Sequence, residues 1–259
     1  DKIRFAYFDC YILNRPGAEK DYSAEEMEQV NELKKTITEE ERKELVNTII
    51  VKTQGFVNEN FKGNVSKPVE LFNDLLALYQ GVDKQQLREN LKYFLNEVVP
   101  VAQQYGVNLC IHPDDPPFPV LGLPRIVGNT EDIEWILNAV DVPNNGFTFC
   151  AGSLSSGLHN DVPVMAKKFA KRTHFVHLRS TDVAENGNFI EASHLEGRGH
   201  LVELVRIFER EHPGLPMRVD HGKLMLDDVE KSDNPGYSFY GRMYALAEVS
   251  GIMAAVRNS

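Results

Sequence analysis

The chain has 259 residues, of which 42% are hydrophobic and 25% are charged, a composition typical of a globular protein with a sizeable buried core. Its formal net charge of −10 argues against a surface that binds nucleic acid. No apolar run approaches the roughly 20 residues of a membrane-spanning helix, so no membrane partner is expected. The three cysteines are widely spaced, and no two of them form a CxxC pair. A disulfide framework is therefore not expected, which favours a reducing, cytoplasmic location.

The first part of the chain, residues 1–82, shows no regular alternation of strands and helices. Residues 3–12 are rich in β-branched and aromatic side chains and are predicted to be extended. The sequence Asn14-Arg-Pro-Gly17 then predicts a turn. After a loop predicted over residues 53–68, a short helix is predicted from about Val69 to Tyr79.

The charged stretch between these segments predicts two helices with capped starts. Ser23 is followed three residues later by Glu26, and Thr38 by Glu41, which is the spacing of a capping box. This polar, helix-rich block has the character of an insertion that covers another part of the protein. We therefore interpret residues 1–82 as a helical excursion that serves as a lid.

From Asp83 onward the pattern changes to repeated strand–helix units. A long amphipathic helix is predicted over residues 84–105 and leads into a first strand. Four short apolar runs then each end on a residue type that binds metal ions, namely His112, Cys150, His177 and Asp220. In parallel α/β proteins, buried strands are short apolar stretches, and ligands gather just beyond their carboxyl ends. The four side chains are therefore predicted to converge on one ion.

The types of donor atom narrow the kind of metal site. Imidazole and thiolate suit zinc or Fe(II), and a carboxylate is also acceptable to Mn(II). A structural zinc site usually has closely spaced cysteines and four filled positions, a pattern that this chain lacks. We therefore expect coordination positions that stay open for a substrate.

Each candidate also has a simpler interpretation. A single histidine such as His112, or a single strand-end cysteine such as Cys150, is more often a packing residue, so the joint placement carries the argument. Arg179 could form a bidentate pair with a substrate carboxylate, or it could pair with a neighbouring acidic side chain. His174 faces away from His177 by strand alternation and is predicted to be structural.

The number of strands raises a question about the fold. We find four good strands with following helices, whereas a closed (β/α)8 barrel needs eight. Four parallel strands alone would leave two unpaired edges. Either the chain forms an open α/β sheet, or the remaining strands of a barrel lie upstream of Asp1, and we favour the second interpretation.

Ordered motifs along the whole chain resemble the mannonate dehydratase family. The motifs are Leu13-Asn-Arg-Pro-Gly-Ala18, His112-Pro-Asp-Asp-Pro-Pro117, Leu121-Gly-Leu-Pro-Arg-Ile126, Gly146-Phe-Thr-Phe-Cys150, His177-Leu-Arg-Ser180, Asp220-His-Gly222, Asn234-Pro-Gly-Tyr-Ser238 and Gly241-Arg242. Two positions depart from the pattern that the resemblance implies. Val219 stands where a proline is expected, and Lys223 where a histidine is expected.

The resemblance implies a TIM (β/α)8 barrel lyase that converts D-mannonate to 2-keto-3-deoxy-D-gluconate and water in glucuronate catabolism, with Mn(II) or Fe(II). Residues 83–259 would hold the C-terminal half of the barrel, strands 5–8, and residues 1–82 the helical insertion. The implied metal ligands are His112, Cys150, His177 and Asp220. The implied catalytic pair is His221 and Tyr237. Arg179 is our candidate substrate-binding residue, because its guanidinium could pair with a substrate carboxylate.

Other functions remain open at this stage. A different divalent-metal TIM-barrel sugar isomerase or epimerase would use the same kind of ion. A barrel nuclease is disfavoured by the acidity of the chain and the absence of a basic stripe in the sequence. A non-catalytic barrel that binds a sugar acid, or a purely structural one, is the non-enzymatic alternative. We expect a small sugar-acid ligand, with assembly into a homo-oligomer left open.

Overall fold

The computed structural model describes residues 1–53, 66–231 and 236–259. The chain divides into two compact units. The first contains residues 1–82 together with Val120–Leu123, and the second contains Asp83–Pro119 and Pro124–Ser259. Within the described residues, no helix is both long and apolar enough to cross a membrane.

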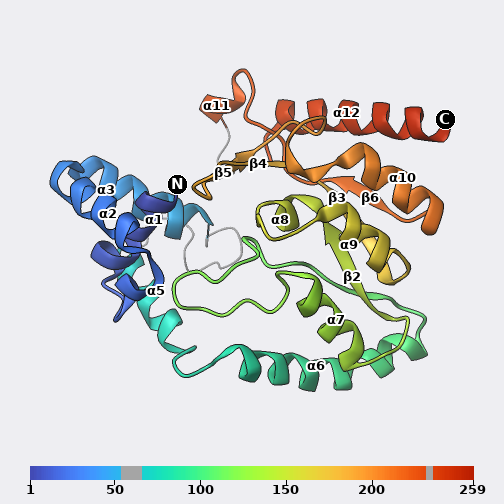
Figure 1. Ribbon diagram of the computed structural model, residues 1–259, viewed down its shortest axis with the longest axis horizontal. Coiled ribbons are helices and arrows are strands. Elements are labelled where there is room, and N and C mark those ends of the chain that lie inside the picture. The colour runs from blue at the N-terminus through green and yellow to red at the C-terminus, as the bar shows by residue number, and fades with distance from the viewer. Residues whose placement is uncertain (54–65, 232–235) are drawn as a thin grey trace. The chain divides into compact units, whose positions relative to one another are not determined.

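The regular elements of residues 1–82 are all helices in the described part (Figure 1). These elements are α1 (Lys2–Tyr7), the π-helix η1 (Phe8–Leu13), the 3₁₀-helix η2 (Ala18–Asp21), α2 (Ala24–Thr36), α3 (Glu39–Val46), the π-helix η3 (Asn47–Lys52) and α5 (Pro68–Ala77). One apolar cluster joins Phe8 and Ile50 to Phe72 of α5 and Leu121 of the returning segment. The short helix that the sequence predicts from Val69 is confirmed as α5, whereas residues 54–65 of the predicted loop lie outside the described residues.

The prediction that residues 3–12 are extended is wrong, because they form α1 and η1. Their β-branched and aromatic side chains favour strands, but that preference is weak and depends on the surroundings. The side chain of Asp1 caps the helix by accepting a hydrogen bond from the Arg4 amide at 3.0 Å. Four consecutive residues, 6–9, are completely buried. Enclosure on all sides by neighbouring helices thus overrides the local preference.

Both predicted capping boxes are present. The Ser23 hydroxyl accepts a hydrogen bond from the Glu26 amide, and the Glu26 carboxylate accepts one from the Ser23 amide. Thr38 and Glu41 make the same reciprocal pair at the start of α3. Each box satisfies two amide groups that would otherwise have no partner in the first turn of the helix.

The second unit is a mixed α/β fold built on a parallel sheet. Helix α6 (Lys84–Gln104) confirms the long predicted helix and leads into the strand β1 (Leu109–Ile111). The elements that follow are α7 (Thr130–Ala139), β2 (Asn145–Cys150), α8 (Ala151–Ser155), α9 (Val162–Phe169), η5 (Ala170–Arg172), β3 (Thr173–Leu178), β4 (Thr181–Val183), β5 (Phe189–Glu191), η6 (Gly197–Gly199), α10 (Leu201–Glu211), β6 (Met217–Val219), α11 (Asp228–Lys231) and α12 (Phe239–Arg257).

Within the described residues, the sheet has four strands in the order β1-β2-β3-β6, and every neighbouring pair is parallel. All four predicted strands are therefore confirmed, and they lie side by side in chain order. Between β3 and β6, the chain makes a separate antiparallel hairpin from β4 and β5 (Figure 1). Helix α7 contacts β2 and α12 contacts β6, so helices cover the apolar surfaces of the strands.

The core of the second unit is centred on aromatic rings between the sheet and α10. Phe149 of β2 and Phe208 of α10 are both completely buried, with their ring centroids 5.3 Å apart. Phe147, two residues earlier on β2, packs edge to face against Phe149 with ring centroids 6.1 Å apart. This packing holds the carboxyl end of β2, and hence Cys150, against a helix that cannot shift without opening a cavity.

We predict that Phe208→Ala lowers the free energy of unfolding by about 3–5 kcal/mol, because it removes a buried ring and leaves a cavity beside Phe149. Chemical denaturation followed by circular dichroism measures the change. The matched control is Val202→Ala on the same helix, where the side chain is 37% exposed. A loss for Phe208→Ala no larger than that of the control would contradict this account of the core.

Candidate active site

The four predicted metal ligands lie at the same edge of the parallel sheet. Cys150 is the last residue of β2 and stands opposite His177 in the register of β2 with β3. His112 directly follows β1, and Asp220 directly follows β6. Because parallel strands present their carboxyl ends at one edge, the sheet itself brings these side chains together.

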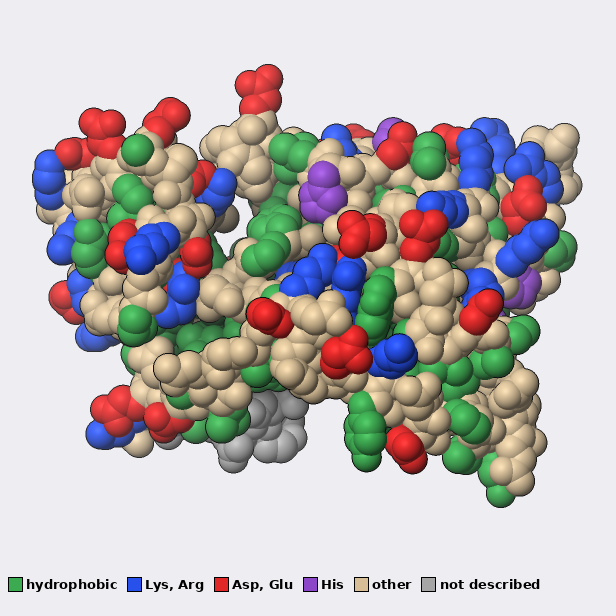
Figure 2. All heavy atoms as spheres, turned by 60° about the horizontal axis from the view of Figure 1, so that its bottom comes forward, with side chains coloured by type: hydrophobic (Ala, Val, Ile, Leu, Met, Phe, Trp, Pro, Cys, Tyr) green, Lys and Arg blue, Asp and Glu red, His purple; other side chains and the backbone are tan. Residues whose placement is uncertain are grey.

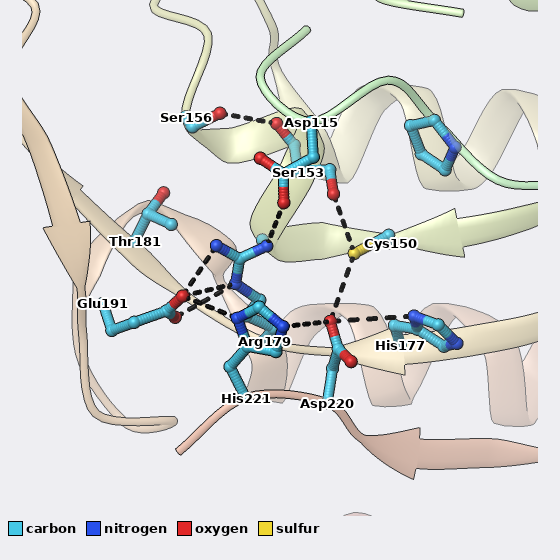
Figure 3. Close-up of polar contacts among 12 residues, drawn as sticks. Asp115, Cys150, Ser153, Ser156, His177, Arg179, Thr181, Glu191, Asp220 and His221 are labelled. Atoms are coloured by element: carbon cyan, nitrogen blue, oxygen red, sulfur yellow. Dashed lines mark hydrogen bonds and ion pairs between the residues drawn. The ribbon is translucent and has the colours of Figure 1, made fainter. Parts of the chain in front are cut away.

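The distances between the donor atoms suit a single ion. His112, Cys150 and His177 each offer one donor atom, and these atoms lie within 4.8 Å of one another. His112 Nε2 is 3.2 Å from His177 Nδ1. The Asp220 carboxylate lies 3.8 Å from His177 Nδ1 and 4.0 Å from Cys150 Sγ (Figure 3). Donors that bind one ion at roughly 2.0–2.3 Å stand about 3–4 Å apart, so the residues present fit a divalent metal.

Neighbouring groups orient two of these donors. His112 Nδ1 lies 2.7 Å from the Pro113 carbonyl oxygen, which accepts a hydrogen bond and leaves Nε2 as the donor atom directed at the cluster. The Ser153 hydroxyl donates a hydrogen bond to Cys150 Sγ at 3.2 Å. Cys150 is completely buried whereas His112 is exposed, so the donor cluster runs from the core to the surface.

Arg179 pairs with two acids next to this cluster. Its side chain is buried, and its terminal nitrogens lie 2.5 Å from the Asp115 carboxylate and 2.7 Å from the Glu191 carboxylate (Figure 3). Burial by itself would lower the pKa of Arg179, but the two carboxylates outweigh burial and hold that pKa above its ordinary value. The pairing with neighbouring acids is therefore observed, and contact with a substrate carboxylate stays a prediction.

The predicted catalytic pair is assembled beside Asp220. The rings of His221 and Tyr237 pack edge to face, with centroids 4.8 Å apart. His221 Nδ1 lies 2.9 Å from a Glu191 oxygen, and its Nε2 lies 3.9 Å from Asp220 Oδ2. The Tyr237 hydroxyl donates to Asp220 Oδ1 at 3.4 Å. Burial, together with the negative charge of Asp220, raises the pKa of Tyr237.

Comparison with known proteins decides the family. The family model for D-mannonate dehydratase matches residues 16–259 of the chain. The chain belongs to the D-mannonate dehydratase family. It is 44% identical to a mannonate dehydratase of Marinomonas sp. (strain MWYL1), an alignment that covers 100% of this chain and 67% of that protein. It is 40% identical to a mannonate dehydratase of Chromohalobacter salexigens, an alignment that covers 99% of this chain and 66% of that protein.

A solved structure is also similar to this member of the D-mannonate dehydratase family. The crystal structure of mannonate dehydratase from Streptococcus suis serotype 2 superimposes with a TM-score of 0.65 at 34% sequence identity. The match covers 69% of this chain and 52% of that chain. The chain thus spans about half the length of the solved protein and about two thirds of the two relatives.

The structure shows two residues near the donor cluster that the sequence patterns missed, Glu191 and Asp115. It also confirms the prediction that His174 is structural. Glu191 ends a short hairpin strand with no motif around it, and Asp115 lies within the motif of residues 112–117, where no role was predicted for it. Only their shared partner, Arg179, could have suggested either of them. His174 Nε2 lies 2.8 Å from the Pro143 carbonyl oxygen, and its ring lies against Gly146 at the start of β2, as a structural residue would.

Gly152 is required by the path of the Arg179 side chain. A Cβ atom built on Gly152 would collide with the aliphatic carbons of Arg179, which runs directly across the first turn of α8. A larger residue at this position would push the guanidinium away from the carboxylates of Asp115 and Glu191. The glycine at position 152 therefore makes room for a buried ion-pair network.

We predict that Gly152→Ala lowers the free energy of unfolding by about 1–3 kcal/mol through this collision. The matched control is Gly251→Ala in helix α12, where a Cβ atom meets nothing within 4 Å. That control should raise stability by up to about 1 kcal/mol, because alanine is the better helix former. Thermal and chemical unfolding measure both variants, and equal stabilities would remove the proposed conflict with Arg179.

Proposed function

We propose that the protein dehydrates D-mannonate to 2-keto-3-deoxy-D-gluconate in glucuronate catabolism, with Mn(II) or Fe(II) as its metal. The single observation that carries the proposal is the convergence of His112, Cys150, His177 and Asp220 at one sheet edge, beside His221 and Tyr237. Membership of the D-mannonate dehydratase family supports the choice of substrate.

The reaction needs a positive charge next to the substrate carboxylate. Removal of the proton at C2 leaves a second negative charge beside the carboxylate, which is unfavourable unless that charge is stabilised. A divalent ion held by His112, Cys150, His177 and Asp220 supplies several kcal/mol of this stabilisation when bound. The mixed set of imidazole, sulfur and carboxylate donors is compatible with Mn(II) or Fe(II).

The protein's own groups handle the protons. One group must take the C2 proton, and another must protonate the C3 hydroxyl as it leaves, so that a molecule of water is lost. His221 and Tyr237 are in ring contact with each other, and both lie next to Asp220. This proximity lets the two groups act on adjacent carbons of one bound substrate. Arg179 would bind the substrate carboxylate, since its guanidinium lies beside the donor cluster (Figure 3).

For the fold, we propose that β1, β2, β3 and β6 are strands 5–8 of a (β/α)8 barrel. The supporting observations are parallel pairing in chain order, helices between strands and donor residues at the carboxyl ends. We propose that residues 1–82 act as its lid. In support, Val120–Leu123, from the loop that follows His112, packs within the helical unit through Leu121.

We propose a cytoplasmic location and a small-molecule partner. The described cysteines are all unpaired, which suits a reducing compartment. Acidic and basic side chains are interspersed over the face drawn in Figure 2, and the net charge is −10. This distribution of charge does not favour binding to a nucleic-acid backbone.

A divalent-metal sugar isomerase or epimerase is the nearest alternative function, and a non-catalytic sugar-acid-binding barrel is the second. Mass spectrometry separates the dehydratase from both alternatives, because only a dehydratase gives a product that is lighter than the substrate by one water.

We predict that Cys150→Ser and His177→Ala each raise the dissociation constant for Mn(II) by more than tenfold, because each removes a donor atom from the cluster. Titration calorimetry on the full-length protein measures the affinity, and chelation should abolish the formation of the 3-deoxy-2-keto acid until Mn(II) is returned. Cys110→Ser is the matched control, since Cys110 is exposed on β1. Undiminished affinity in both site variants would refute the proposed ligand set.

We predict that His221→Asn and Tyr237→Phe each lower kcat by about 10²–10⁴-fold, because each removes a proton-transfer group. The affinity for Mn(II) should change little, which separates the two effects. Tyr240→Phe is the control, because this tyrosine is 43% exposed on α12. Steady-state kinetics with D-mannonate measures all three variants. Full activity in either site variant would exclude that residue from catalysis.

A further inference from the structure

Glu191 lies between Arg179 and His221, two side chains that adjoin the donor cluster. Its carboxylate lies 2.9 Å from His221 Nδ1 and 2.7 Å from an Arg179 terminal nitrogen, and it also accepts from Arg179 Nε at 3.0 Å (Figure 3). Its side chain is about a quarter exposed. The two donors therefore approach the same carboxylate from different elements, one following β3 and the other following β6.

This contact fixes which nitrogen of His221 carries a proton. Burial by itself would raise the pKa of Glu191, but hydrogen bonds from His221 and Arg179 outweigh burial and hold that pKa below its usual value. An ionised carboxylate can only accept hydrogen bonds, so His221 Nδ1 must be the donor. The other ring nitrogen, Nε2, is then directed toward Asp220 at 3.9 Å.

We propose that Glu191 is a positioning residue that holds His221 as its Nδ1–H tautomer and so presents Nε2 as the atom that exchanges a proton with the substrate. The inference rests on the proposed dehydratase function and deepens it. A carboxylate or carbonyl behind a reactive imidazole is a general means of fixing its tautomer and the plane of its ring.

The structure holds Glu191 firmly enough for this role. Within the β4–β5 hairpin, Glu191 pairs with Thr181. Just beyond it, the Ser193 hydroxyl and the His194 amide donate to the two oxygens of Glu248 at 2.8 and 3.0 Å. Glu248 belongs to α12, so the segment that carries Glu191 is fastened to a long helix.

A simpler interpretation is that Glu191 only neutralises the buried Arg179. Asp115 provides a matched comparison, because it pairs with the same guanidinium at 2.5 Å. Among the contacts described for these residues, Glu191 joins Arg179 to His221, whereas Asp115 joins Arg179 alone. A variant of each acid therefore separates charge neutralisation from control of the histidine.

The first experiment reads the tautomer directly. The full-length protein is labelled with ¹⁵N-histidine, reconstituted with diamagnetic Zn(II), and its ring nitrogens are observed by NMR, with His221→Asn assigning the signals. We expect the Nδ1–H tautomer in the parent protein and in Asp115→Asn, and a shift toward Nε2–H in Glu191→Ala. Glu191→Gln can still accept a hydrogen bond through its amide oxygen, so its His221 tautomer population should be intermediate between the parent protein and Glu191→Ala. It replaces the alanine variant in this test if that variant does not fold. An unchanged His221 signal in Glu191→Ala and Glu191→Gln, or an equal shift in Asp115→Asn, overturns the proposal.

The second experiment uses kinetics of the Mn(II)-loaded protein with D-mannonate. Glu191→Ala should lower kcat by about 10–100-fold with little change in KM, and Glu191→Gln should restore part of the loss. Equal kcat for Glu191→Ala and the parent overturns the proposal. A protein that makes no 3-deoxy product, yet shows the Glu191-dependent tautomer, supports the positioning role while refuting the dehydratase function, so the two failures are distinguishable.

Discussion

The parallel pairing of β1, β2, β3 and β6 is the constraint on which the candidate active site depends. The strands are short, and β1 and β6 have only three residues each, yet their alignment decides which side chains meet. Cys150 faces His177 because the register of β2 with β3 places them opposite one another. A shift by one residue would turn the donors to the other face of the sheet. The buried rings of Phe149 and Phe208 resist such a shift, since it would disrupt a close-packed core. Packing away from this edge of the sheet therefore sets the geometry of the donor cluster.

The buried charge of Arg179 imposes a second constraint. A guanidinium removed from water is costly unless carboxylates compensate for it. Asp115, in the loop after β1, and Glu191, at the end of β5, do so. The network therefore ties the loop after β1 to the hairpin after β3. The same loop after β1 reaches Val120–Leu123, which packs in the helical unit. Charge compensation thus holds the loop after β1 and the β4–β5 hairpin in place beside the donor cluster. It also orients Glu191, which accepts a hydrogen bond from His221.

The sequence predicted the four strands and the meeting of the side chains at their carboxyl ends, because both depend on local patterns. A short apolar run that ends in histidine, cysteine or aspartate contains the strand and its ligand together, and both predicted capping boxes also lie within four residues. The prediction for residues 3–12 was wrong, because β-branched and aromatic side chains serve equally in a helix that is enclosed on all sides. Glu191 was missed for a different reason. Its partners lie 12 and 30 residues away in the sequence, and a three-residue hairpin strand carries no motif that signals them.

The position of Tyr237 relative to His221 is set by a close crossing of two chain segments. A Cβ atom on Gly222 would collide with the backbone of Gly241, and one on Gly241 would collide with the Lys223 carbonyl oxygen, so both positions need glycine. The Asp228 carboxylate accepts a hydrogen bond from the Gly241 amide at 2.9 Å in the first turn of α12. Burial by itself would raise the pKa of Asp228, but this and other hydrogen bonds outweigh burial and hold it below its usual value. The carboxylate therefore stays ionised and keeps the start of α12 against the segment that carries His221. Tyr237 immediately precedes Ser238, the N-cap of α12, and its ring packs edge to face against His221.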